Sequence, residues 1–230
     1  MAKNRITGAT KNKARKAKAA GGMRKQGIIS PSFLDKAAES SKLIFQKETC
    51  SNEEVNQMSY CDAQGECNYQ IDYSTIMIGD RIIPFVFELD LAQSVLNPPP
   101  GQNQRFCYRV TGVGENISTF QSLSHWVLAL NDSISLSQIR NVEVTIGGVP
   151  QTVIIGGNVN LYLPPDTDPA TGCSGLKFDF PLSKVRNAPD SAGLFCFELT
   201  TTYPVGPVGV CVTSRQVSSS ALSICGPGYC

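Results

Sequence analysis

The sequence predicts an all-β fold, an antiparallel, jelly-roll-like β-sandwich of about ten strands behind a basic N-terminal tail. From residue 69 onward, short apolar or alternating segments recur about every 8–15 residues, with turn residues between them. The chain of 230 residues contains 20 Gly and 14 Pro, while only 17% of its residues are charged. Within this pattern no segment has the length and apolar period of a helix.

Three parts are expected along the chain. Residues 1–27 hold nine Lys or Arg and no acidic residue, so a disordered basic tail is predicted there. Residues 28–68 are expected to be a connector with a short helix or strand and a Cys-flanked polar loop, and residues 69–230 to form the β-sandwich domain. The connector carries an apolar cluster, Leu43, Ile44 and Phe45, which is a candidate docking segment.

The strands are expected where the apolar segments occur. Residues 71–78 alternate loosely and residues 81–91 more clearly, although Pro84 restricts the second strand to an edge or a bulge. A hairpin is expected around Gly147 and Gly148. The remaining strands are expected at residues 106–113, 124–130, 142–146, 149–155, 158–163, 176–182, 194–200, 208–212 and 221–224.

Strict alternation in two of these segments predicts which side chains face the core. In residues 176–182, Leu176, Phe178 and Phe180 share one face. In residues 194–200, Phe195, Phe197 and Leu199 share one face, opposite Leu194, Cys196 and Glu198.

The cysteine pattern predicts disulfides rather than a metal centre. There are nine cysteines, none in the basic tail, and no two are spaced as Cys-x-x-Cys, which argues against zinc and iron–sulfur sites. Because nine is odd, at least one thiol stays free or bonds another chain. Cys50 and Cys230, which flank the body, are the candidates for intermolecular disulfides. The candidates for structural disulfides are Cys61, Cys67, Cys107, Cys173, Cys196, Cys211 and Cys225, with the connectivity open.

No catalytic constellation is recognisable, so the chain is expected not to be an enzyme and to use no cofactor. His125 is the only histidine, and Gly-x-Ser-x-Gly does not occur, so His125 is interpreted as a strand residue that bonds a neighbouring loop. Four acidic residues on predicted strands alternate with apolar ones and are interpreted as a solvated sheet face: Glu88, Asp90, Asp179 and Glu198.

A weak metal candidate lies in a turn-rich segment. Asp166 and Asp168, with Thr171, give this segment the oxygen density of a calcium loop. Pro169 interrupts the pattern, so a turn held by Asx hydrogen bonds is favoured and no metal is expected.

The basic tail has several possible partners. It could neutralise phosphates, but it lacks the interleaved aromatic residues that stack on bases, so nucleic acid is not favoured. It could equally bind an acidic protein layer or an acidic neighbouring subunit, or simply increase solubility. No apolar segment follows the N-terminal charges and no run of 18 apolar residues occurs, so neither a classical signal peptide nor a membrane span is expected.

Five short sequence segments resemble those of a known protein family. They are residues 124–130 (SHWVLAL), 149–152 (VPQT), 171–180 (TGCSGLKFDF), 193–205 (GLFCFELTTTYPV) and 222–228 (LSICGPG). In this order, over about residues 70–230, they resemble a family of Cys-bearing β-domain proteins of spore-forming Firmicutes, similar to exosporium and endospore-appendage structural proteins. The chain departs from that pattern at Asn131 and near Val153, where the family has cysteines, so the resemblance does not give the pairing.

The resemblance implies a structural role at a spore surface, the exosporium or coat, or in another extracellular assembly. Self-association, or association with other spore-surface proteins, would then use strand pairing and disulfide cross-links, and an N-terminal extension would reach a neighbour. Synthesis inside a cell that later lyses would explain disulfides without an export signal. The alternative function is a carbohydrate- or cell-surface-binding β-sandwich module, with Tyr162, Trp126 and Tyr203 as candidate contact residues.

Overall fold

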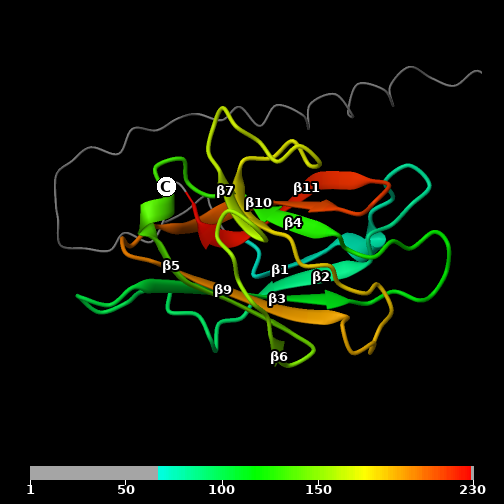
Figure 1. The fold of residues 1–230 in the computed structure, drawn as a ribbon, viewed down its shortest axis with the longest axis horizontal. Helices are drawn as coiled ribbons and strands as arrows, with labels where there is room; N and C mark the ends of the chain where they lie inside the picture. Colours follow the sequence, from blue (N-terminus) through cyan, green and yellow to red (C-terminus); the bar gives the residue numbers. More distant parts are fainter. Residues whose placement is uncertain (1–66, 229–230) are drawn as a thin grey trace, which may run out of the picture. The chain divides into compact units, whose positions relative to one another are not determined.

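The computed structural model describes residues 67–228, which form two antiparallel sheets packed as a sandwich (Figure 1). The predicted all-β sandwich is therefore confirmed. The six-stranded sheet has the order β1 (Gln70–Asp72), β2 (Phe85–Leu89), β3 (Gln104–Gly112), β9 (Ala192–Leu199), β5 (Ile139–Ile146), β6 (Val149–Pro150). The five-stranded sheet has the order β11 (Ser218–Pro227), β10 (Val205–Thr213), β4 (His125–Leu128), β8 (Gly175–Phe178), β7 (Val159–Tyr162).

The chain crosses between the sheets repeatedly. It passes from β3 to β4, back to β5, and later from β8 through β9 to β10, so that sequence neighbours often lie in opposite sheets. Strands distant in sequence pair instead, as β3 does with β9 and β4 with β10. This alternation is typical of jelly-roll sandwiches.

Several strand predictions are wrong in extent, and three of the differences have an identifiable cause. Asp72 ends β1 because its side chain accepts the Ser74 N–H and starts a 3-10 turn, η2 (Tyr73–Thr75). Pro84 precedes β2 rather than interrupting it, and β2 lies between β1 and β3 rather than at an edge. The hairpin turn at Gly147 and Gly148 exists, with φ of 56° and 82°, but its second strand stops at Pro150 instead of running to residue 155.

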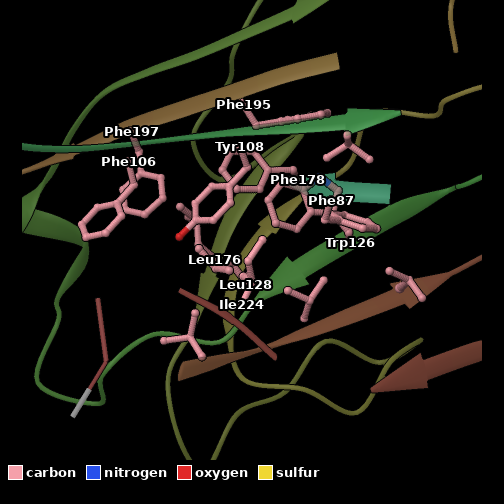
Figure 2. Packing of buried hydrophobic residues seen from close by; sticks show 14 of the residues in the cluster. Phe87, Phe106, Tyr108, Trp126, Leu128, Leu176, Phe178, Phe195, Phe197 and Ile224 are labelled. Carbon is pink, nitrogen blue, oxygen red and sulfur yellow. The ribbon is translucent and has the colours of Figure 1, made fainter. Parts of the chain in front are cut away.

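The core is built around the indole of Trp126, which both sheets enclose (Figure 2). Its ring centroid lies 4.8 Å from that of Phe178 in a stacked arrangement. It makes edge contacts at 5.4 Å with Phe87 and 5.3 Å with Phe195, both on the opposite sheet. The two alternating segments bury the side chains that the sequence assigned to the core: Leu176, Phe178, Phe180, Phe195, Phe197 and Leu199.

One edge of the sandwich is fastened from sheet to sheet. Cys67, just before β1, forms a disulfide with Cys225 of β11. Nearby, the Tyr73 hydroxyl donates to the carbonyl of Val210 and accepts the Leu222 N–H at 3.3 Å. The disulfide makes Cys67 part of the sandwich, although residues 28–68 were the expected connector.

Replacing Phe178 by Ala should lower the free energy of unfolding by about 3–5 kcal/mol, because the stacked partner of Trp126 is lost and a cavity remains. Urea titration followed by the fluorescence of Trp126, the only tryptophan, measures this. Met77→Ala, at a side chain 59% exposed, is the control and should change stability little. Equal stability of both variants would contradict this account of the core.

Burial raises the pKa of Tyr73 to about 12, although the hydrogen bond from Leu222 acts to lower it. The folded state therefore holds the phenol proton more tightly than the unfolded state, whose tyrosine titrates near 10. Its contribution to stability is complete below pH 10 and is lost as the pH rises to about 12. Tyr73→Phe should cost about 1–2 kcal/mol at pH 7 and flatten this alkaline decline, as denaturation at several pH values would show. An unchanged alkaline decline would argue against it.

Candidate functional site

Residues 163–174 form the loop between β7 and β8, and this loop folds over the outer face of the five-stranded sheet. We call this loop the strap. One end is covalently fixed, because Cys173 forms a disulfide with Cys211 of β10. Inside the strap, the Asp168 N–H donates to the Cys173 carbonyl at 2.9 Å, and the Gly172 N–H donates to the Asp168 carbonyl at 2.8 Å. These bonds fold the strap into a compact turn, in which the Asp168 side chain points toward the sheet.

The carboxylate of Asp168 is fully buried between the strap and the sheet. Its Oδ1 lies 3.0 Å from Lys177 Nζ, and its Oδ2 lies 3.0 Å from His125 Nε2. Oδ2 also accepts the N–H and the hydroxyl of Thr171 at 3.0 and 2.9 Å. His125 and Lys177 reach it because β4 and β8 alternate, with Trp126 and Phe178 facing the core.

Burial alone would raise the pKa of Asp168. The hydrogen bonds from His125, Lys177 and Thr171 outweigh this and hold the pKa well below its usual range. The pKa of Lys177 is raised, because its ion pairs with Asp168 and Asp179 outweigh desolvation. The cluster is therefore a buried carboxylate whose Oδ2 accepts hydrogen bonds and whose Oδ1 is held by the ion pair with Lys177, and these contacts fasten the strap to the sheet.

The same cluster contains a histidine–carboxylate pair, the orienting half of a catalytic triad. A triad also needs a nucleophile bonded to the other ring nitrogen, and within residues 67–228 no Ser, Thr or Cys side chain bonds His125. The side chain of His125 bonds the loop above it, as the sequence interpretation expected.

In the 166–171 segment, the Asp168 carboxylate accepts the N–H of Thr171, three residues further along the chain, so an aspartate side chain helps to hold this turn. Asp166, the other half of the weak calcium candidate, is exposed, whereas Asp168 already meets protein donors at both oxygens. Among the described residues, no group of three or more His, Cys, Asp or Glu side chains is placed to hold a metal ion.

The outer face of the six-stranded sheet carries a second polar group around a disulfide. Cys107 and Cys196 are directly opposed on β3 and β9 and are bonded, with their Cα atoms 4.1 Å apart. Beside them Arg105 forms ion pairs with Glu143 at 2.7 Å and Glu198 at 3.3 Å. Arg109, on the other side, pairs with Asp90 at 2.6 Å.

Three of the four candidate carboxylates form ion pairs: Asp90, Asp179 and Glu198. Desolvation raises the pKa of Glu198, but hydrogen bonds from Asn103, Asn141 and Arg105 outweigh it and lower the pKa. Asp179 lies 3.4 Å from Lys177, and Glu88 is opposite Arg109 in the register of β2 and β3. The three paired carboxylates are therefore divided between cations on two sheets.

Six of the seven candidate structural cysteines form the three disulfides Cys67–Cys225, Cys107–Cys196 and Cys173–Cys211. The seventh, Cys61, lies outside the described residues. So do the candidate intermolecular cysteines, Cys50 and Cys230, and the candidate docking residues, Leu43, Ile44 and Phe45.

The three aromatic candidates for carbohydrate contact do not form an exposed platform. Trp126 is fully buried in the core, which rules it out as a surface contact. Tyr203 is half-buried, and its hydroxyl accepts a hydrogen bond from Gln138 at 2.8 Å. Tyr162 is half-buried on the edge strand β7.

Sequence reasoning missed two residues that organise these sites. Lys177 completes the Asp168 cluster, beside Thr171, which the turn-rich segment had already pointed to. Gln104 is fully buried and bonds the carbonyls of Leu96 and Tyr203 through its amide nitrogen. No local sequence pattern identifies Gln104 or Lys177 as members of these sites.

Comparison of the chain with protein-family models, with curated proteins and with solved structures found no match. None of the helices in the described part of the chain is long and apolar enough to cross a membrane. The three disulfides indicate that the domain matures in an oxidising environment.

Asp168→Asn should lower the free energy of unfolding by about 2–3 kcal/mol at pH 7, because Lys177 would lose its buried counterion. In the parent protein, the stabilisation from Asp168 is present above pH 4, near its ordinary pKa, and is lost as the pH falls toward the lowered folded pKa. The variant should therefore decline less steeply in acid, as denaturant titrations between pH 7 and pH 2 would show.

Asp166→Asn, at an exposed carboxylate in the same strap, is the matched control and should leave both stability and acid response unchanged. Equal effects of the two substitutions would show that the buried cluster does not fasten the strap.

Proposed function

We propose that this protein is a non-catalytic structural subunit of a disulfide-cross-linked assembly at a spore surface or in another extracellular structure. The observation that carries the proposal is a count of thiols. Six of the nine cysteines are paired inside the sandwich, which leaves Cys50, Cys61 and Cys230. Three is odd, so at least one of them has no intrachain partner and is available to another chain.

The internal disulfides support this role, because each one is used within the fold. One joins the two sheets at an edge, one joins β3 to β9, and one ties the strap to β10. A sandwich closed in this way would tolerate thiol exchange at its termini while its own bonds remain satisfied. The remaining cysteines are on the segments that flank it.

A non-catalytic role is supported by the polar clusters. His125 and Lys177 contact a buried carboxylate that holds a loop in place, and Arg105 and Arg109 pair with acidic neighbours. The histidine, lysine and arginines of these clusters therefore have structural partners. The resemblance of residues 70–230 to spore-surface structural proteins supports placing the assembly there.

Charge separation supports contact between subunits. Residues 1–66 carry twelve Lys or Arg against seven Asp or Glu, whereas residues 67–228 carry eight against twelve. The basic segment of one copy would thus be attracted to the acidic sandwich of the next, and the attraction would weaken as salt increases.

Native protein should run as a ladder of multimers in non-reducing electrophoresis and as a single monomer band after reduction. A variant with Cys50, Cys61 and Cys230 replaced by Ser should run as a monomer in both conditions, because the three internal disulfides do not join chains.

The control is Cys173→Ser together with Cys211→Ser, which should keep the ladder while lowering stability, because that pair fixes the strap. Mass spectrometry of the multimer bands identifies the bonded residues. A native protein that is monomeric with and without reductant would refute the covalent assembly.

A further inference from the structure

We infer that the edge of the sandwich formed by β6, β7 and the segment 151–158 between them is a docking surface, and that its occupant is the segment Leu43, Ile44, Phe45 of this chain. We call this surface the uncharged edge. The inference goes beyond cross-linking, since it concerns a non-covalent contact that would exist without any intermolecular disulfide.

The uncharged edge exposes apolar side chains in a segment that contains no charged residue. Residues 145–165 contain no Asp, Glu, Lys or Arg. Within them, Val149 is 61% exposed, Ile154 57% and Ile155 47%. Sheet edges are normally protected by charges, because an apolar edge invites association.

The other edges of the sandwich differ from this one. At the far side, β1 and β11 are fastened by the Cys67–Cys225 disulfide. The part of β5 not covered by β6 presents Arg140 and Glu143, with a register shift between them at Asn141, whose φ is 46°. Residues 216–228, which include β11, also contain no charged residue, but no large apolar side chain is exposed there. Among these edges, the one at β6 and β7 therefore combines a lack of charge with three exposed large apolar side chains.

The uncharged edge is also held in a fixed shape. The Gln151 N–H donates to the Val144 carbonyl at 2.8 Å, which continues the path of β6. Beyond it, the Asn158 side chain accepts the Ile154 N–H at 2.8 Å and donates to the Thr152 carbonyl at 2.8 Å. An ordered apolar surface loses little conformational entropy when it binds a partner.

The chain outside the described residues contains a segment of matching chemistry. Leu43, Ile44 and Phe45 form an apolar cluster, and the 46–66 segment that joins it to Cys67 can span about 70 Å when extended, more than the width of a domain of this size. The segment can therefore reach the uncharged edge of its own sandwich or of a neighbour.

Charges at the ends of the two segments are complementary. Lys42 and Lys47 flank the apolar cluster. Two exposed acidic residues mark the ends of β7. The Asp179 N–H donates to the Asn158 carbonyl, and its side chain remains 47% exposed although it lies 3.4 Å from Lys177; the Asp166 N–H donates to the Leu163 carbonyl. An extended 42–47 segment has about the length of residues 158–163, so apolar side chains meet the uncharged edge while the lysines meet carboxylates.

The test measures amide hydrogen exchange in the full chain with Cys50, Cys61 and Cys230 replaced by Ser. In this background, Leu43→Asp/Ile44→Asp/Phe45→Asp should speed exchange in residues 149–162 about tenfold, because the docked segment is lost. Reciprocally, Ile154→Asp should speed exchange in residues 42–47. Near-UV circular dichroism of Trp126 confirms that each variant keeps its core.

Two substitutions serve as matched controls. Leu34→Asp removes an apolar residue of the N-terminal segment outside the cluster, and Met77→Asp adds a charge at a side chain 59% exposed elsewhere on the sandwich. Neither should change exchange at the uncharged edge.

Exchange at residues 149–162 that is the same with and without the 43–45 cluster would overturn the inference. Protection that rises with protein concentration but ignores the 43–45 substitutions would also overturn it, since a second sandwich would then be the occupant. Protection that needs the cluster supports it, and its dependence on concentration tells whether the cluster comes from the same copy or another. Because the cysteines are absent throughout, this result is independent of the electrophoretic ladder.

Discussion

The stacking of Trp126 on Phe178, closed from the opposite sheet by Phe87 and Phe195, is the interaction on which the rest of the sandwich depends. It fixes the spacing and the facing of the two sheets at their centre. Because strands alternate, the residues next to these aromatics must point outward, and they are His125 and Lys177 on one sheet. The outer faces are polar as a consequence of how the core is filled.

The outward-facing side chains of His125 and Lys177 are covered by the strap and are largely shielded from water. The strap places a carboxylate between His125 and Lys177, so burial is compensated by ion pairing instead of being avoided. On the opposite sheet, the Cys107–Cys196 disulfide lies between two arginines that are paired with acidic residues. Each face thus combines one disulfide with one cluster of paired charges.

Local pattern predicted the faces of strands well but their ends poorly. Alternation placed Phe178 and Phe195 in the core because a period of two directly reports a half-buried strand. Strand ends depend on single contacts, such as the Asp72 cap, and the pairing of His125 with Asp168 joins elements 43 residues apart. Cysteine pairing was equally out of reach, because the three disulfides span separations of 158, 89 and 38 residues with no local mark.

The Cys67–Cys225 disulfide also determines how the domain carries mechanical load. It joins the residue at which the described chain begins to one near its end. Tension applied between the N-terminal segment and the C-terminus therefore passes through covalent bonds from Cys67 to Cys225. The 157 residues between them are bypassed, so tension along the chain is not transmitted through them. The sandwich can therefore stay folded beside a short covalent link while the chain on either side of it is stretched.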